Sequence, residues 1–381
     1  MKTMDAPDVV DFNGWDKPVR SKTNPLRIAL VAPPWYEIPP SGYGGIEALC
    51  YSLVQGLVAR GHDVTLVAAG QNNTAAAFEP TFPEPPPGLG EVAGSLVEMA
   101  HAAKAARVLE RLDPDIVHDH SAAGPLTAAG RAAPTVITVH GPVGPEESEY
   151  YTNLGPGVSL VAISNSQRSL APALPWVATV HNAIPVDEYP FRGEKDDFAL
   201  FLSRINPDKG VHLAIEAAQA AGMRLVIAGK CSEPGEQEYF DAEVAPRLGP
   251  GVEWLGEADA RLKDDLYPRA RCLLLPIQWE EPFGLVMVEA MACGTPVVAL
   301  GRGSVPEIVL DGVTGFVRDR EEDLPEALRH LDAIDPQACR DHVRRNFDNE
   351  VMVGRYEAVY RSVLDGLEPS SNTAGSFVRM P

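Results

Sequence analysis

Short apolar runs of strand length alternate along the chain with longer segments in which apolar residues recur at helical spacing. The strand-like runs cover residues 26–32, 64–68, 116–121, 135–140 and 160–164, then 198–202, 225–228, 252–255, 271–275 and 296–300. The segments of helical spacing cover residues 46–60, 94–112, 211–221 and 348–367. Because strands that alternate with helices are typical of parallel sheets, this pattern predicts an α/β protein with a parallel sheet in each half.

Three stretches lack either period. Residues 1–25 are polar, which predicts a loosely attached extension, and residues 368–381 have the composition of a disordered tail. Residues 74–90 are rich in proline and alanine and include three consecutive prolines. This composition predicts a surface loop, which is a candidate acceptor-side element.

Composition and charge narrow the classes of function. The 381 residues have room for two domains, and a hydrophobic content of 45% is enough for full cores. The chain has 32 basic and 53 acidic residues, hence a net charge of −21. Long-range repulsion argues against nucleic acid and anionic lipid as partners.

The cysteines and the N-terminus indicate the compartment. The chain has 5 cysteines, far apart and without a C-x-x-C pair, which indicates free thiols in a reducing compartment. No segment reaches transmembrane length, and the acidic start lacks the basic and apolar regions of a signal peptide. We therefore expect a cytoplasmic protein without membrane insertion.

Two carboxylates lie in the segment between the runs 271–275 and 296–300. The sequence Glu281-Pro-Phe-Gly-Leu-Val-Met-Val-Glu289 places Glu281 on a loop and Glu289 about two turns away, inside a helix. Carboxylates suit a ligand rich in hydroxyls, and the backbone of residues 283–285 brings N–H groups to the positive end of that helix. Spacing alone leaves open a second interpretation, in which Glu289 lies on a solvated face of a buried strand-helix-strand unit.

Glycines and histidines mark the ends of strands in the first half. Gly42, Gly44 and Gly45 lie on a strand-to-helix turn, where the backbone can approach a phosphate, although many such turns are only tight turns. The turn lacks both the Walker ending and the dinucleotide fingerprint. His118, His120 and His140 stand at the carboxyl ends of strands, the edge where open α/β sheets bind ligands. Structural histidines there are the alternative.

Two cations follow the first strand of the second half. Arg204 and Lys209 lie on the turn between the run 198–202 and the helix 211–221. A guanidinium fork and an ammonium at the positive end of a helix would make an anion clamp. The alternative is a pair of solvated surface cations.

These motifs resemble, in order, those of retaining GT-B glycosyltransferases of family 4, also called glycosyl transferases group 1. The resemblance runs from about residue 26 to residue 366 and rests on five separate elements in the right order, among them the E-x7-E segment and the Arg204–Lys209 turn. It implies the GT-B fold, with two Rossmann-like domains whose parallel sheets face a central cleft. Their expected bounds are 26–182 and 183–347, with the helix 348–367 crossing back. Ser203 and Ala183 stand where this family usually has glycine.

The resemblance also implies roles for individual residues. The donor-binding set is Gly44, Gly45, Arg204, Lys209, Gly256, Glu257, Glu281, Phe283, Gly284, Leu285 and Glu289. The catalytic set is His120, Glu281, Arg204 and Lys209, and the acceptor-side set is His140 and Tyr43. Glu289 would accept hydrogen bonds from the ribose, and Glu281 would hold the donor sugar. His120 is preferred over His118 as the histidine beside that sugar.

The implied reaction is transfer of a sugar, with retention, from a nucleotide diphosphate sugar of the UDP or GDP type to a hydroxyl of a small-molecule or glycan acceptor. The nucleotide sugar is a substrate, so no cofactor is expected. The sequence has no Asp-x-Asp turn or His/Cys ligand cluster, so we expect no metal requirement. A monomer or a homodimer is expected. A GT-B epimerase and a non-catalytic sugar-nucleotide-binding protein are the alternatives.

Overall fold

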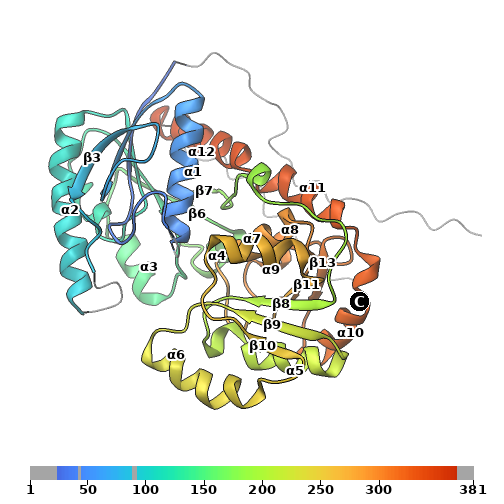
Figure 1. The fold of residues 1–381 in the computed structure, drawn as a ribbon. Helices are drawn as coiled ribbons and strands as arrows, with labels where there is room; N and C mark the ends of the chain where they lie inside the picture. The colour runs from blue at the N-terminus through green and yellow to red at the C-terminus, as the bar shows by residue number, and fades with distance from the viewer. Residues whose placement is uncertain (1–23, 42–43, 88–91, 367–381) are drawn as a thin grey trace, which may run out of the picture.

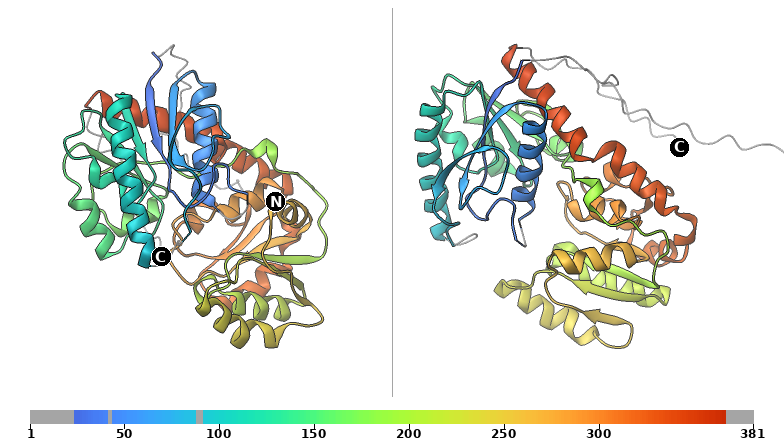
Figure 2. Two further views of the ribbon diagram at one scale, coloured as in Figure 1. Left: turned by 60° about the vertical axis from the view of Figure 1, so that its left-hand side comes forward. Right: turned by 45° about the horizontal axis from the view of Figure 1, so that its top comes forward.

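The computed structural model describes residues 24–41, 44–87 and 92–366. Most of the expected extension 1–25, the expected tail 368–381 and the candidate Tyr43 lie outside the described residues. The described chain forms two parallel sheets with helices packed around each. Each sheet with its helices forms a distinct domain in every view (Figure 1, Figure 2).

The first sheet has, in the described part of the chain, seven parallel strands in the order β3-β2-β1-β4-β5-β6-β7. They are β1 (Arg27–Val31), β2 (Asp63–Ala69), β3 (Ala77–Phe82), β4 (Ile116–Asp119), β5 (Thr135–Val139), β6 (Val158–Ala162) and β7 (Trp176–Thr179). Side chains of β1 alternate between two cores. Ile28 and Leu30 belong to a cluster with α1 (Gly45–Ala59), whereas Ala29 and Val31 belong to one with α2 (Val92–Leu112). A sheet covered on both faces needs the continuous apolar strands seen in the sequence.

The expectation of a surface loop over residues 74–90 is wrong for its central part. Strand β3 lies there and pairs in parallel with β2 at the edge of the sheet. Pro80 is tolerated because an edge strand leaves one side of its backbone unpaired. Only Thr81 of this strand is buried, so the strand lacks the apolar run that marks its neighbours.

The second sheet has six parallel strands within the described residues, in the order β10-β9-β8-β11-β12-β13. They are β8 (Phe198–Leu202), β9 (Arg224–Ala228), β10 (Val252–Trp254), β11 (Cys272–Leu275), β12 (Val297–Leu300) and β13 (Gly315–Arg318). Five of these match predicted runs. Strand β13 was missed because it is short and its second half is only half-buried, so it shows no apolar run.

Helices complete both domains. The remaining ones are α3 (Pro145–Thr152), α4 (Asn165–Leu170), α5 (Val211–Ala221), α6 (Pro234–Tyr239), α7 (Ala260–Arg269), α8 (Leu285–Ala292), α9 (Val305–Ile308), α10 (Leu324–Arg329), α11 (Pro336–Asn346) and α12 (Asn349–Leu364). A single large core joins strands β8 to β13 with α5, α8, α10 and α11. Among the described helices, none has both the length and the hydropathy needed to cross a membrane.

Helix α12 returns from the second domain to the first and packs against α1 (Figure 1, Figure 2). Its buried Met352, Val353 and Tyr356 share a core with β1 and α1. The approach is close, since a Cβ atom at Gly56 of α1 would lie 2.4 Å from Cγ2 of Val353. The apolar stripe of α12 is therefore part of the first domain's core, as its helical period suggests.

Candidate active site

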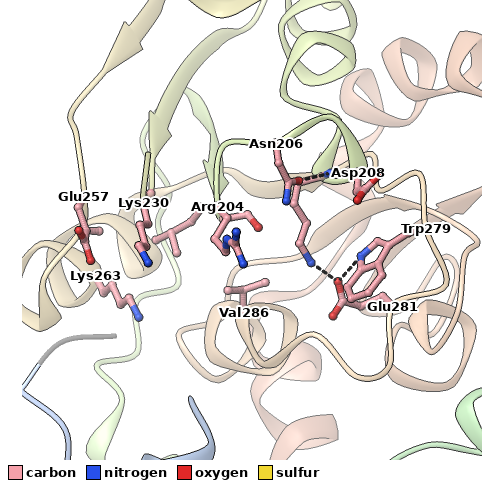
Figure 3. A pocket seen from close by; sticks show the side chains of 14 residues that line it. Arg204, Asn206, Asp208, Lys230, Glu257, Lys263, Trp279, Glu281 and Val286 are labelled. Carbon is pink, nitrogen blue, oxygen red and sulfur yellow. Dashed lines mark hydrogen bonds and ion pairs between the residues drawn. The ribbon is translucent and has the colours of Figure 1, made fainter. Parts of the chain in front are cut away.

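A pocket of about 500 Å³ opens at the carboxyl ends of β8, β9 and β11 (Figure 3). Its lining consists of Leu202, Ser203, Arg204, Asn206, Asp208, Lys209, Gly229, Lys230, Glu257, Ala258, Lys263, Trp279, Glu281 and Val286. Parallel strands end at one edge of a sheet, so the loops that follow them collect polar side chains there. Four of the predicted residues meet in this pocket, namely Arg204, Lys209, Glu257 and Glu281.

Arg204 is held by two glutamates at the start of α6. Its Nε and Nη2 atoms lie 2.8 Å and 2.7 Å from Oε1 of Glu236, and Nη2 lies 3.0 Å from Glu233. The other oxygen of Glu236 accepts backbone N–H groups of Ser232 and Glu233. Burial alone would raise the pKa of Glu236, but these backbone bonds and Arg204 lower it. Glu236 is therefore an ionised carboxylate that fixes the position of the Arg204 guanidinium.

Lys209 forms a second charged cluster in the same pocket, with Glu281 and Trp279, which Figure 3 labels. Its Nζ lies 2.5 Å from Oε2 of Glu281 and 4.5 Å from the ring centre of Trp279. Trp279 donates its indole N–H to the same carboxylate oxygen at 3.0 Å. The Asn206 side chain accepts the backbone N–H of Lys209 at 3.0 Å and so shapes the turn. Glu281 is thereby oriented by two donors.

Helix α8 begins at Leu285, four residues after Glu281, and carries Glu289. Gly284 precedes the helix with φ +79, in the left-handed region that favours glycine. Glu289 is not among the pocket-lining residues, but it follows Val286, which is, by one turn on the same helix. Its Oε2 accepts a hydrogen bond of 2.6 Å from the Tyr267 hydroxyl of α7. The two predicted carboxylates therefore occupy the wall and the flank of one pocket.

The histidines of the first domain divide into two roles. His118 is buried, with Nδ1 2.7 Å from the Tyr360 hydroxyl and Nε2 2.8 Å from Thr138. His120 places Nδ1 2.9 Å from Nε2 of His140, and its own Nε2 is buried without a partner among the described atoms. Both nitrogens of His118 are thus engaged in the core. His120 differs in having one ring nitrogen without a hydrogen-bond partner among the described residues, and its preference over His118 as the histidine beside the donor sugar stays a prediction.

Burial drives these groups toward their neutral forms. It lowers the pKa of His118 to about 3 and that of His140 to about 4, and it lowers the pKa of His120 well below its usual range. Burial also raises the pKa of Glu47 to about 7 and that of Asp119 to about 6. At neutral pH the imidazoles are uncharged, so each can donate one hydrogen bond and accept another.

The two domains meet where the predicted glycine turn approaches α8. A Cβ atom at Gly45 would lie 3.3 Å from Cδ1 of Leu285. At Gly44 the φ is +147, and a Cβ atom would lie 2.8 Å from Pro40, so a side chain there meets both strain and contact. The approach of Gly45 to Leu285 brings two of the donor-binding candidates together across the domain boundary.

A partly buried glutamate also links the domains. Glu307 of α9 accepts the backbone N–H groups of Asn165 and Ser166 at the start of α4, at 2.8 Å and 2.5 Å. Its Oε2 lies 3.1 Å from Nε2 of His181. Sequence reasoning assigned Glu307 no role, because its partners lie far away along the chain.

Further predicted residues of the second domain do not line the pocket. Phe283 is buried beneath the start of α8, and Gly256 accepts the backbone N–H of Gly229, a lining residue, at 2.9 Å. Sequence reasoning missed Trp279, Glu236, Tyr267, Lys230 and Lys263. Lys230 follows β9 directly, so the rule that ligands bind at the carboxyl ends of strands could have found it. Within the described residues, no group of three or more His, Cys, Asp or Glu side chains is placed to hold one metal ion.

Family models match both halves of the chain. Residues 43–183 match the model described as Glycosyltransferase Family 4, and residues 188–340 match the one described as Glycosyl transferases group 1. The chain belongs to the group 1 glycosyltransferases. The family predicted from the motifs is thereby confirmed.

Individual relatives of this glycosyltransferase vary in what they make. Glycogen synthase of Mycobacterium tuberculosis (strain H37Rv) is 27% identical over 344 residues, which cover 76% of this chain and 81% of the relative. A D-inositol 3-phosphate glycosyltransferase of Mycolicibacterium smegmatis is 33% identical over 168 residues, or 43% of this chain and 35% of the relative.

Solved structures confirm the GT-B fold. AviGT4, a glycosyltransferase involved in avilamycin A biosynthesis, superposes with a TM-score of 0.69 at 27% identity, covering 90% of this chain and 99% of its own. Anabaena Alr3699/HepE in complex with UDP-glucose superposes with a TM-score of 0.68 at 18% identity, covering 88% and 100%. The predicted fold class, two parallel-sheet domains of the GT-B type, is confirmed.

Proposed function

We propose that this glycosyltransferase moves a sugar from a nucleoside diphosphate sugar of the UDP or GDP type to a hydroxyl of a small-molecule or glycan acceptor, with retention at the anomeric carbon. The observation that carries the proposal is the presence of Arg204 and Lys209 in one pocket, each oriented by a carboxylate. Cations fixed in this way suit a diphosphate. The Anabaena structure, which holds UDP-glucose, gives a precedent for the donor.

The donor half of the reaction needs charge stabilisation at the leaving diphosphate. Arg204, Lys209 and the N–H groups at the start of α8 supply fixed positive charge, a role that a metal ion fills in other enzymes. We therefore propose that catalysis is independent of metal. Glu281 would accept hydroxyls of the donor sugar, because Lys209 and Trp279 hold only its Oε2. Glu289 would accept hydroxyls of the ribose.

The acceptor half would use the first domain. Uncharged His120 and His140 can exchange hydrogen bonds with a neutral hydroxyl without first losing a hydration shell. A lipid in an anionic membrane is a poor candidate for the acceptor. On α2, Lys104 stacks 3.5 Å from the Phe82 ring centre and Arg111 pairs with Glu79, so two of its cations are engaged. The net charge of −21 adds repulsion.

One experiment tests the proposal in two steps. Nucleotide sugars are screened for protection of the full chain against thermal unfolding, since a ligand that binds only the folded state raises apparent stability. The best donor is then incubated with candidate sugar and alcohol acceptors, with and without EDTA. We expect protection by a UDP or GDP sugar, a product of retained anomeric configuration, and undiminished turnover in EDTA.

Each other outcome rejects a defined part of the proposal. Inversion at the anomeric carbon would reject retention, and EDTA-sensitive turnover restored by Mn²⁺ would reject metal independence. A changed sugar nucleotide formed without any acceptor would favour an epimerase. Transfer to lipid in anionic liposomes, with salt-sensitive binding to them, would reject the small-molecule acceptor. Protection without any turnover would favour a non-catalytic binding protein.

A further inference from the structure

Tyr267 makes a contact that the proposed chemistry does not yet use. It lies on α7 with 1% of its surface exposed, and its hydroxyl is 2.6 Å from Oε2 of Glu289 on α8. A buried hydroxyl needs a partner, and here the partner is the carboxylate on the flank of the donor pocket. The bond therefore joins the core of the domain to a candidate ligand-binding group.

The geometry leaves Tyr267 little freedom. Its ring packs in the large core of the second domain, and its backbone carbonyl accepts the Thr295 hydroxyl at 2.5 Å. Burial and the neighbouring Glu289 carboxylate raise the pKa of Tyr267 well above its usual range, so the hydroxyl keeps its proton. Tyr267 is thus a hydrogen-bond donor of fixed position.

A hydrogen-bond donor of fixed position on one carboxylate oxygen of Glu289 also fixes the orientation of the other oxygen. Among the described residues, Oε2 of Glu289 accepts the Tyr267 hydroxyl and Oε1 accepts no hydrogen bond. Glu289 is only partly buried and shares a helix with Val286, which lines the pocket. A carboxylate without an internal partner would rotate among several orientations, at a cost in entropy when a ligand fixed it.

We infer that Tyr267 is a positioning residue, which holds the carboxylate of Glu289 so that the protein distinguishes a ribonucleotide from its 2′-deoxy counterpart. The inference rests on the proposed function, in which Glu289 accepts the ribose hydroxyls. Tyr267 itself touches no ligand, because it is buried behind Glu289. A site built to accept a hydroxyl rejects the analogue that lacks it, provided that the acceptor stays in place.

The test measures dissociation constants of the full chain for two matched pairs, UDP with 2′-deoxy-UDP and GDP with 2′-deoxy-GDP. We expect the wild-type protein to prefer the ribonucleotide of its own base by roughly tenfold, the value of one charge-assisted hydrogen bond. Tyr267→Phe should weaken binding of that ribonucleotide about tenfold and leave its deoxy analogue nearly unchanged, so that the ratio approaches one.

Two further variants separate positioning from a general loss of structure. Tyr189→Phe is the control, since Tyr189 is a half-buried tyrosine near Glu289 whose hydroxyl makes no hydrogen bond to it among the described residues. Its ribose preference should equal that of the wild type. Glu289→Gln should lose the preference, and adding Tyr267→Phe to it should cause no further loss, because coupled groups are non-additive.

The outcomes are decisive either way. A ribose preference that survives Tyr267→Phe, or an equal loss for both members of a pair, would overturn the positioning role while the proposed function stands. If Tyr267→Phe fails to fold, a ribose preference that survives in Glu289→Gln overturns the inference. Failure of the wild-type protein to bind any nucleoside diphosphate would instead reject the proposed function.

Discussion

The two edges that face each other across the domain boundary have opposite electrostatic designs. The donor pocket of the second domain keeps its charges, with Arg204 on Glu236 and Lys209 on Glu281. At the strand edge of the first domain, by contrast, the titratable groups shift toward their uncharged forms. Burial pushes the pKa values of His120 and His140 down and that of Glu47 up, so all three shift toward neutrality.

The difference suits the function proposed above, in which the second domain binds the donor diphosphate and the first domain binds the acceptor. A diphosphate carries several negative charges, and preorganised cations stabilise it because they need no reorganisation as the charge develops. An acceptor hydroxyl is neutral, and an uncharged imidazole pair can meet it at a small cost in desolvation. We therefore expect substitution of a charged residue in the second domain to have a large effect on turnover. Substitution of a buried titratable residue in the first domain should instead change stability in a way that depends on pH.

The largest expected effect comes from Lys209→Ala. Removal of one preorganised charge should lower kcat by about 100- to 1,000-fold, or ~2.7–4 kcal/mol of transition-state stabilisation. The free energy of unfolding should fall far less, because Glu281 keeps the Trp279 N–H as a partner. Steady-state kinetics and urea unfolding of the same preparation give the two numbers.

A matched control separates the site from charge in general. Arg320 pairs with Asp323 on the surface, with its side chain 63% exposed, so Arg320→Ala should leave both turnover and unfolding nearly unchanged. If Lys209→Ala lowers the free energy of unfolding by as much as it raises the activation free energy, the charges of the second domain are structural.

The donor pocket was largely predictable from sequence because its parts are local. Arg204, Lys209, Glu281 and Glu289 lie in short motifs at the ends of apolar runs, and such ends converge in a parallel sheet. What orients these residues was not predictable. Tyr267 lies on a different helix from its partner Glu289, and nothing in either segment's period marks the contact.

The first domain shows the same limit. His118 and His120 are two positions apart and share one face of the strand, with ring centres 4.1 Å apart. Sequence places both at a strand end, but it does not show that the returning helix α12 brings Tyr360 into hydrogen-bond contact with His118. A pairing across 242 residues leaves no local signal. Likewise, β3 is defined by its pairing with β2 more than by its own composition.

The second prediction concerns the first domain and is smaller. Glu47 is buried, and its pKa is raised to about 7. A carboxyl that titrates higher in the folded state than in the unfolded state binds more protons when folded, so stability falls as pH rises between the two pKa values. Glu47→Gln removes this dependence. Relative to wild type, the variant should gain about 2 kcal/mol between about pH 5 and about pH 8.

Urea unfolding of both proteins across that pH range gives the difference directly. Glu238→Gln is the control, since Glu238 is exposed, and its curve should run parallel to that of the wild type. If the free energies of unfolding of Glu47→Gln and wild type differ by the same amount at every pH, burial does not raise the pKa of Glu47. Glu47 would then not be one of the groups that burial shifts toward neutrality in the first domain.

The smallest expected effect concerns the contact that joins the two edges. Glu307 accepts two backbone N–H groups of α4 and lies 3.1 Å from Nε2 of His181. Burial alone would raise the pKa of Glu307, but His181 and the two N–H groups lower it overall. Glu307→Gln keeps one acceptor oxygen and the side-chain shape, so it should cost about 1 kcal/mol of unfolding free energy at neutral pH.

The sign of the pH dependence identifies the cause. A carboxyl with a lowered folded pKa stabilises the fold above its unfolded pKa, and this contribution is lost as pH falls through the folded pKa. The gap between wild type and Glu307→Gln should therefore close in acid, whereas Glu326→Gln, on an exposed ion pair, should show almost no gap at any pH. A gap that persists below the folded pKa would mean that Glu307 acts through packing, and that the domains are not joined by a charge.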